Sequence, residues 1–376
     1  MISSFSIRGY RGFNKFSMGG LGRINLLVGT NNCGKTSVLE AIHLLTEMGD
    51  PFALWQLLWR RGERLVPSPN ANLPDRPVRR SATELDVSHL FHGREAQLGA
   101  SMQIAAERDG FLREVDISLA EVPPHEQPEL FADDEPIGLR LAITISGTPR
   151  PGVTFIPLSR AGGMYSDVLE LSTRRRRLRS SPDWAIPVLF ITTESLTGDD
   201  LVALWNKVAL TPLESLVLRA LQFLEPKIER VASQSSTGSY YAAPARAGFI
   251  LKLKGVDQPV PIGSMGDGMW RMLALAIALT QCQGGVLLVD EIDTGLHYTV
   301  LAKMWKLIFS AAKEFDVQVF ATTHSSDCIH SLAELSSDMD RSNSITVQRI
   351  EIGREKAVRY DADEISIAAR REIEVR

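Results

Sequence analysis

The sequence predicts an α/β protein with a mainly parallel sheet, a β-rich insertion and a short helical arm. Two observations indicate the sheet. A buried apolar run at 24–28 leads through a glycine loop into a helical pattern, and apolar strands alternate with helices between 269 and 322. A third observation separates the insertion, because prolines, glycines and short alternating runs are frequent between 50 and 185.

The N-terminal elements follow from the spacing of their apolar residues. Residues 2–7 alternate apolar and polar side chains, which predicts a strand, and residues 24–28 are continuously apolar apart from one asparagine, which is typical of a buried strand. Residues 36–46 carry apolar side chains at helical spacing. The chain therefore opens as strand, loop and helix.

The loop between that strand and that helix carries a phosphate-binding motif. Residues 29–36 match the pattern GxxxxGK[ST] without exception. In this motif the backbone N–H groups and the helix N-terminus face the phosphates, the lysine reaches the β- and γ-phosphates, and the hydroxyl binds Mg²⁺. Because the match lies between a predicted strand and helix, we favour function over chance, and we predict ATP and Mg²⁺ as cofactors. The predicted nucleotide-binding residues are Gly29, Asn31, Asn32, Gly34, Lys35, Thr36 and Ser37.

Two acids follow the apolar strand predicted at 286–289. Asp290 and Glu291 stand at its C-terminal end, where ligands collect in open α/β sheets. With Thr36, Asp290 is the expected partner of Mg²⁺, directly or through water. Glu291 is placed to orient and deprotonate an attacking water, and with Lys35 it is a predicted catalytic residue. The alternative, a strand end with solvated carboxylates, loses weight beside the P-loop.

Two further segments have polar ends that a nucleotide could use. The strand predicted at 317–322 leads to His324, whose imidazole could hydrogen-bond a γ-phosphate, although a lone histidine there is more often structural. Residues 264–268, Ser-Met-Gly-Asp-Gly, form a loop that opens a helix and offers backbone N–H groups. The alternative for this loop is a simple serine-capped helix start.

In this order, the four segments resemble those of the ABC-type ATPases of the RecF/SMC/OLD group, where OLD stands for overcoming lysogenization defect. Residues 264–268 are similar to the signature loop of stand-alone ATP-binding proteins of this group, rather than to the LSGGQ of transporters. Residues 291–298 resemble their D-loop region, residues 7–13 their first strand, and residues 372–376 their ending.

The resemblance implies an ABC-type ATPase head of the P-loop NTPase class, which forms an ATP-driven, head-to-head homodimer or a higher homo-oligomer. It implies that Asp293 and His297 lie near the subunit contact. The order of the segments, with the histidine strand after the P-loop and the acidic strand, makes His324 a further predicted catalytic residue that could sense the γ-phosphate. The resemblance also implies DNA repair or phage defence, with a separate nuclease or toxin as effector. Too little chain follows His324 for a Toprim domain, so no nuclease is expected here. The loop residues that would meet the partner's nucleotide are Ser264, Gly266, Asp267 and Gly268.

The domain boundaries follow changes in texture along the chain. We predict a helix over 211–231, with Thr211 as its cap and Glu214 closing a capping box. The predicted divisions are the ATPase head at 1–48 and 250–340 with 186–200 joining it, the insertion at 49–185, the helical arm at 201–249, and a C-terminal tail at 341–376.

Composition limits the partners and the compartment. The net charge of −4 demands no nucleic acid, but the basic run at 174–179 could contact a DNA backbone or, equally, the acidic stretch at 126–135. Three widely spaced cysteines argue against a disulfide framework, and no apolar run could span a bilayer. We therefore expect a cytoplasmic chain without a membrane partner.

A different class of function stays open. The chain could be an ATP-gated scaffold that turns over negligibly and sequesters a toxic or nuclease partner until it is triggered. The rate of turnover would distinguish this scaffold from a true hydrolase.

Overall fold

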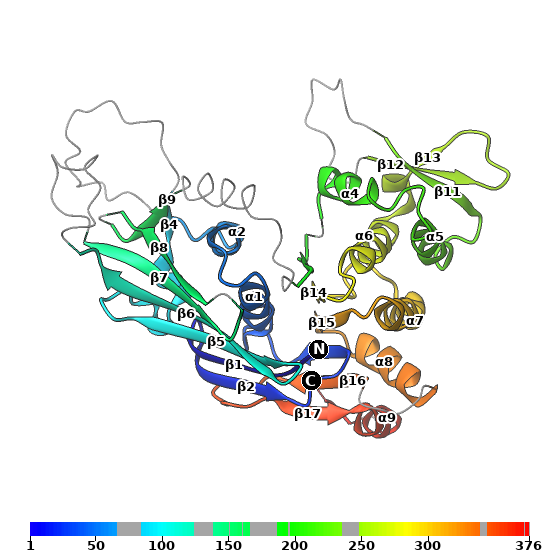
Figure 1. The fold of residues 1–376 in the computed structure, drawn as a ribbon. Coiled ribbons are helices and arrows are strands. Elements are labelled where there is room, and N and C mark those ends of the chain that lie inside the picture. Colours follow the sequence, from blue (N-terminus) through cyan, green and yellow to red (C-terminus); the bar gives the residue numbers. More distant parts are fainter. Residues whose placement is uncertain are drawn as a thin grey trace.

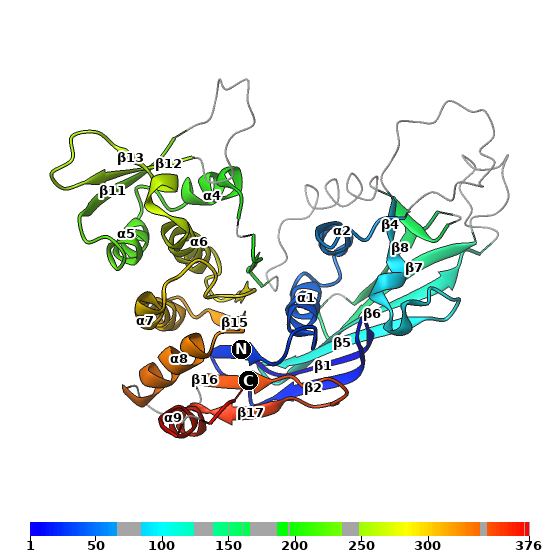
Figure 2. The same cartoon turned by 180° about the vertical axis from the view of Figure 1, so that it is seen from behind.

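A computed structural model of the chain describes residues 1–65, 84–123, 138–149, 151–159, 161–165, 186–194, 196–234, 248–338, 344–371 and 373–375. The basic run at 174–179 and the acidic stretch at 126–135 lie outside these residues. Two six-stranded sheets form the body of the described part, and Figures 1 and 2 show it from opposite sides.

The first sheet is mainly parallel and carries the predicted nucleotide motifs. Neighbouring strands pair in parallel, except that β17 is antiparallel to β16. The predicted α/β class is therefore confirmed. The strands, in spatial order, are β10 (Val188–Ile191), β14 (Val286–Val289), β15 (Gln318–Thr322), β3 (Ile24–Val28), β16 (Ile345–Arg349) and β17 (Val358–Asp361).

The second sheet is antiparallel throughout. Its strands alternate buried and more exposed residues, which is the pattern of a sheet with one face on a core. In spatial order they are β2 (Phe13–Gly19), β1 (Ile2–Tyr10), β5 (Ser101–Arg108), β6 (Phe111–Glu121), β7 (Leu139–Ser146) and β8 (Gly152–Pro157). Two short strands, β4 (Glu84–Asp86) and β9 (Gly163–Tyr165), pair beside it.

Helix α1 (Lys35–Thr46) lies between the two sheets. Its apolar residues share one core with the inner face of the antiparallel sheet and with Leu27, Leu288 and Phe320 of the parallel sheet. This position explains why nearly every residue of α1 is buried. Helix α2 (Pro51–Arg60) follows it and is capped by Asp50.

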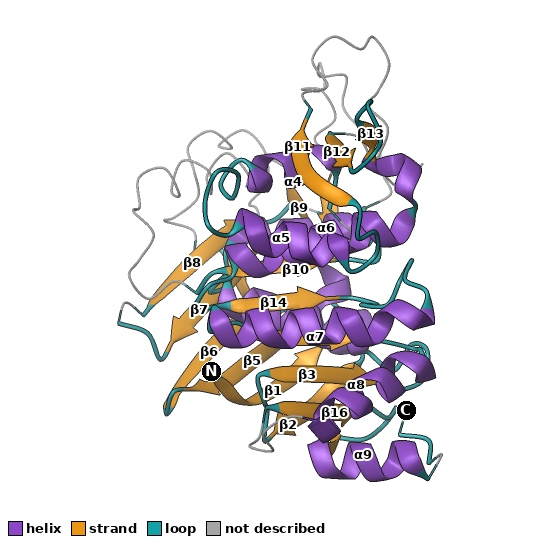
Figure 3. Ribbon diagram, turned by 90° about the vertical axis from the view of Figure 1, so that its right-hand side faces the viewer, coloured by secondary structure: helices purple, strands orange, loops and turns teal. Residues whose placement is uncertain are grey.

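The other face of the parallel sheet is covered by helices, as Figure 3 shows. Apolar side chains of α6 fill the centre of this second core. A three-stranded sheet of β11 (Ile228–Ser233), β12 (Phe249–Leu253) and β13 (Val260–Pro261) packs beside them. The helices are α4 (Gly198–Trp205), α5 (Glu214–Gln222), α6 (Asp267–Gln281), α7 (Tyr298–Glu314), α8 (Ser326–Asp338) and α9 (Ala362–Arg370). Within the described ranges, no helix combines the length and the apolar character needed to cross a membrane.

Strand pairing joins segments that the sequence analysis separated. Strands β5–β8 belong to residues 49–185, yet β5 pairs with β1 along its length. Strand β16 belongs to residues 341–376, yet it pairs in parallel with β3. The predicted divisions after residues 48 and 340 therefore each run through a sheet, because pairing between distant segments leaves no local signal in the sequence.

The helix predicted over 211–231 is wrong in its length and its cap. Helix α5 ends at Gln222, and the chain forms β11 from Ile228. Pro226 explains the break, since proline lacks an N–H and disfavours helical backbone at the residue before it. The N-cap is Leu213 and not Thr211, whose hydroxyl instead accepts from the Leu213 N–H group at 3.2 Å.

Candidate functional site

The P-loop joins the end of β3 to the start of α1, and it requires glycine at two positions. Gly29 has φ 143°, and a Cβ there would lie 2.3 Å from the Ile350 carbonyl oxygen. Gly34 has φ 101°, and a Cβ there would lie 2.4 Å from Cζ of Phe13. Gly34 is the N-cap of α1 and no side chain caps the helix, so its first N–H groups are left for a ligand.

The Lys35 side chain folds back over this loop. Its Nζ donates to the carbonyl oxygens of Gly29 at 2.9 Å and Thr30 at 2.8 Å. Burial lowers the pKa of Lys35, while the nearby Cys33, Asp290 and Glu291 oppose that shift. A phosphate anion in the loop would therefore stabilise the ammonium where the protein alone does not.

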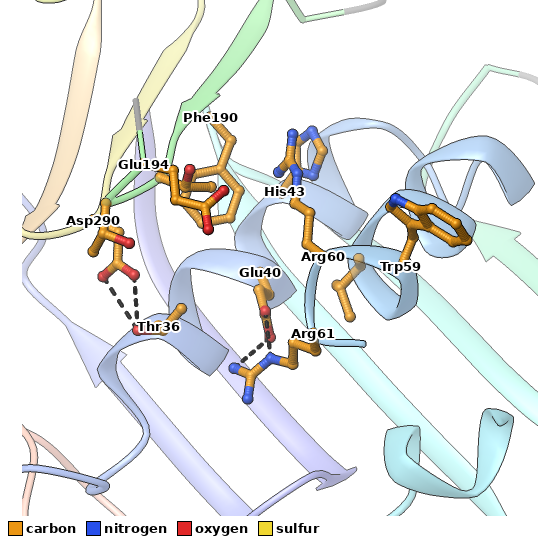
Figure 4. Close-up of a pocket in the computed structure, with 12 residues that line it drawn as sticks. Thr36, Glu40, His43, Trp59, Arg60, Arg61, Phe190, Glu194 and Asp290 are labelled. Carbon is orange, nitrogen blue, oxygen red and sulfur yellow. Dashed lines mark hydrogen bonds and ion pairs between the residues drawn. The ribbon is translucent and has the colours of Figure 1, made fainter. Parts of the chain in front are cut away.

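A hydrogen bond connects α1 to the end of β14. The Thr36 hydroxyl donates to the Asp290 carboxylate, at 3.0 Å from Oδ2 and 3.2 Å from Oδ1 (Figure 4). The Thr322 hydroxyl at the end of β15 donates to Oδ1 of Asp290 at 2.6 Å. Hydroxyl and carboxylate oxygens are the ligands that Mg²⁺ prefers, and it commonly takes only one or two of them from protein. The residues present fit this ion.

Glu291 has an unusual backbone. Its φ is +45°, a left-handed conformation that costs a non-glycine residue roughly 1 to 3 kcal/mol. Its N–H group donates to the Thr322 hydroxyl at 2.8 Å, and its carboxylate accepts from the Thr294 hydroxyl at 3.2 Å. Glu291 is a half-buried residue, and its charge, like that of Asp290, acts on the Lys35 ammonium.

The signature-like segment lies where a short 3-10 helix, Ile262–Met265, leads into α6. Gly266 is the N-cap of α6 with φ 86°, no side chain caps the helix, and Ser264 and Gly266 are exposed. A Cβ on Gly268 would lie 3.0 Å from the Gly295 carbonyl oxygen. The structure therefore packs this loop against the D-loop-like turn of the same chain.

Asp293 is hydrogen-bonded to Thr323, the residue before His324. The Thr323 hydroxyl, at the end of β15, donates to Oδ1 of Asp293 at 2.5 Å. His324 follows directly and is half-buried before α8 begins at Ser326. His297 is exposed, and its Nδ1 lies 3.0 Å from the Thr299 hydroxyl.

Sequence reasoning missed a network that supports α1 from the N-terminal strand. The Arg61 guanidinium donates to Glu40 at 2.7 and 2.9 Å and to the Ser37 hydroxyl at 3.2 Å. Arg11, from the segment 7–13, lies 3.1 Å from the same Glu40 carboxylate. The segment 7–13 thus contacts α1 through the Arg11–Glu40 ion pair. This contact joins residues far apart in the sequence, so only the structure shows it.

A cavity of about 500 Å³ extends from the Thr36–Asp290 bond along α1 (Figure 4). Its walls come from α1, α2 and the chain after β10. The lining residues are Thr36, Glu40, His43, Leu57, Trp59, Arg60, Arg61, Phe190, Thr192, Thr193, Glu194 and Asp290.

Arg271 and Thr322 were also missed as parts of the site. Arg271 stands in the apolar pattern of α6, where a single charge was the only available signal. Its guanidinium donates to the carbonyl oxygens of Asp290 and Glu291. Thr322 was predicted only as the end of a strand, and its hydroxyl contacts both acids.

Comparisons with known proteins agree with this site. A family model described as "AAA ATPase domain" matches residues 1–107. A second, described as "AAA domain, putative AbiEii toxin, Type IV TA system", matches residues 173–327. Together with the parallel sheet, these matches confirm the prediction of a P-loop ATPase.

Individual relatives are distant. An "ATP/GTP phosphatase" of Helicobacter pylori is 20% identical over 365 residues, which are 90% of each chain. An uncharacterized protein of Methanocaldococcus jannaschii is 36% identical over 66 residues, 16% of this chain and 30% of its own.

Solved structures that resemble the chain include SMC heads. The SMC head domain from Thermotoga maritima has a TM-score of 0.45 at 12% identity, over 96% of this chain and 98% of that one. The head with an extended coiled coil from Pyrococcus furiosus, solved with the C-terminal domain of ScpA, has a TM-score of 0.46 at 14% identity, over 99% of each chain.

Proposed function

We propose that this P-loop ATPase works as a head-to-head dimer that closes on ATP and reopens after hydrolysis. The observation that carries the proposal is the Thr36–Asp290 hydrogen bond, at 3.0 Å. It brings the start of the P-loop helix and the acidic strand end to one point, with Glu291 as the next residue. A chance glycine loop would have no reason to meet a carboxylate from a strand more than 250 positions away.

Nucleotide binding would use groups that the loop leaves open. The N–H groups at the start of α1 would receive the phosphates, and Lys35 would exchange the Gly29 and Thr30 carbonyls for phosphate oxygens. Mg²⁺, held by Thr36 and Asp290, would neutralise charge on the phosphates. The exposed Asn31 and Asn32 would border the same phosphates.

Hydrolysis would use Glu291 as general base. Its carboxylate would leave the Thr294 hydroxyl, orient a water and accept its proton. His324 would donate a hydrogen bond to the γ-phosphate from the end of β15. The Thr323 hydroxyl, which donates to Asp293, would connect the backbone next to His324 to the D-loop turn.

The second subunit would supply the exposed signature loop. The loop is open to solvent around Ser264 and Gly266, and the N-terminus of α6 favours an anion there. A γ-phosphate carried by the partner would fill this position. Asp293 and His297 would lie near the contact, since Gly295 packs on the same helix start.

For the wider role we propose DNA repair or phage defence with a separate effector, in the cytoplasm. The support is the resemblance of the signature and D-loop segments to the RecF/SMC/OLD group. A DNA-backbone contact would fall to the basic run at 174–179.

A second candidate role is an ATP-gated scaffold that sequesters a toxic or nuclease partner with negligible turnover. The match of residues 173–327 to a family whose description names a toxin–antitoxin system favours it.

Steady-state ATP hydrolysis by the wild type and by Glu291→Gln, with and without double-stranded DNA, tests the proposal. Loss of the base should lower turnover about 100-fold or more, while ATP binding persists and an ATP-bound dimer accumulates in size-exclusion chromatography. Glu229→Gln, at an exposed position of β11, is the matched control and should behave as wild type. Slow turnover that Glu291→Gln leaves unchanged would contradict the hydrolase and favour the scaffold.

A further inference from the structure

Arg271 connects the helix of the signature loop to the two acids. It lies on α6, four residues after Asp267, and it is only 3% exposed. Its Nη2 donates to the carbonyl oxygen of Asp290 at 2.7 Å and to that of Glu291 at 2.8 Å. Its Nη1 donates to the carbonyl oxygen of Thr192, after β10, at 2.9 Å. One side chain therefore holds the ends of β10 and β14 together.

This arrangement is expensive for stability. Burial lowers the pKa of Arg271 to about 10, although Asp290, Asp293 and Glu291 oppose the shift. The buried Nε has no hydrogen-bond acceptor among the described residues. A partly satisfied buried cation stabilises a fold poorly compared with an apolar side chain of similar volume. Packing alone therefore does not account for an arginine in this apolar helix.

Arg271 stabilises the strained backbone of Glu291. At φ +45° the Glu291 residue needs external contacts to stay in place. The Thr322 hydroxyl accepts from its N–H group, and Arg271 donates to its carbonyl oxygen. The two contacts come from a neighbouring strand, β15, and from a helix, α6.

We propose that Arg271 is a positioning residue, which fixes the Glu291 backbone for hydrolysis and couples it to the signature loop. This inference rests on the proposed ATPase function. Contact between the signature loop and a partner's nucleotide would bear on the first turn of α6, and Arg271, one turn further, would carry the displacement to Asp290 and Glu291. The site would then hydrolyse ATP only when the same subunit's signature loop is engaged.

Three variants test the assignment. Arg271→Met removes every donor, Arg271→Lys keeps a cation with fewer donors, and Thr280→Val is the control. Thr280 is buried near the far end of α6, and its hydroxyl donates only within that helix, to Ile277. We expect kcat to fall about 10- to 100-fold in Arg271→Met and less in Arg271→Lys, as for other residues that orient reacting groups. The KM for ATP and the Kd for ATP should stay within about threefold of wild type, and Thr280→Val should match wild type.

Hydrogen exchange gives a readout that does not depend on turnover. In Arg271→Met, and more weakly in Arg271→Lys, amides 290–294 should exchange about tenfold faster, while amides 29–37 keep wild-type protection. If Arg271→Met does not fold, Arg271→Lys carries the comparison with Thr280→Val.

Two results would overturn the assignment: equal loss of ATP affinity and turnover, or wild-type protection of amides 290–294 in both arginine variants. The proposed function fails separately, through a turnover that Glu291→Gln leaves unchanged. Even in that case, faster amide exchange confined to residues 290–294 in the Arg271 variants would show that Arg271 stabilises the backbone at Asp290 and Glu291.

Discussion

Helices α1 and α6 begin in the same way, and other helices of the described chain begin differently. Each of the two follows a glycine with positive φ, Gly34 at 101° and Gly266 at 86°, and neither has a side-chain cap. By contrast, side chains cap α2, α4 and α9 through Asp50, Thr197 and Asp361. Helices α5 and α7 also lack a side-chain cap, but each follows a non-glycine residue with negative φ. Open N–H groups at a helix start favour an anion, so both α1 and α6 are prepared for one.

The surroundings of the two helix starts differ. At α1, Phe13 lies against Gly34 and Lys35 folds over the loop, so the subunit's own chain covers part of the site. At α6, a Cβ on Gly266 would meet nothing within 4 Å, and the loop is exposed. At α1, a small ligand alone could bind the free N–H groups of the helix N-terminus. At α6, we expect the ligand to be a nucleotide bound to a partner subunit.

The largest expected effect is on ATP binding at α1, where we expect Lys35→Met to weaken binding without lowering the stability of the fold. Lys35→Met should weaken ATP binding about 100-fold or more in a fluorescence titration, because it removes the cation that meets the phosphates. The lowered pKa of Lys35 means that the folded chain disfavours its charge. That cost is fully present below the folded pKa and is relieved as the pH rises from the folded pKa towards 10.5.

The same variant should therefore be about as stable as wild type at pH 7, within about 1 kcal/mol by urea unfolding. Unimpaired ATP binding by Lys35→Met would contradict the assignment of the N-terminus of α1 as the phosphate site. A loss of several kcal/mol would show instead that the lysine is structural.

A smaller effect is expected at the open start. Ser264→Glu places a carboxylate where the partner's γ-phosphate would arrive, so turnover and ATP-dependent dimerisation should fall about tenfold or more through like-charge repulsion. The Kd for ATP should stay within about threefold, since the subunit's own P-loop is untouched. Ser215→Glu, at an exposed position of α5, is the matched control. Equal weakening of ATP binding by Ser264→Glu would mean that the two starts serve one subunit's site.

The smallest effect compares the glycines themselves. Both Gly34→Ala and Gly266→Ala add strain of roughly 1 to 3 kcal/mol at a positive φ. Only Gly34→Ala adds a clash, because its Cβ would lie 2.4 Å from Cζ of Phe13. Its loss of unfolding free energy should exceed that of Gly266→Ala by about 1 kcal/mol or more in urea denaturation. Equal losses would show that Phe13 does not enclose the P-loop.

Features of this protein that depend on neighbouring residues could be predicted from the sequence. The P-loop pattern at 29–36, the apolar strands at 24–28 and 286–289 and the acids after the second strand all follow from neighbouring residues. A glycine loop between a strand and a helix can form only a few geometries, so the motif and its position were predictable together.

The contacts between distant segments could not be predicted from the sequence and were found in the folded chain. The pairing of β1 with β5, the place of β16 beside β3, and the contacts of Arg271 and Thr322 with the acids join residues from separate parts of the chain. Their energies depend on burial and on distances between partners, which a linear pattern does not encode. The nucleotide site could therefore be predicted from local sequence patterns. The backbone conformation of Glu291 and the residues that contact it depend on tertiary packing.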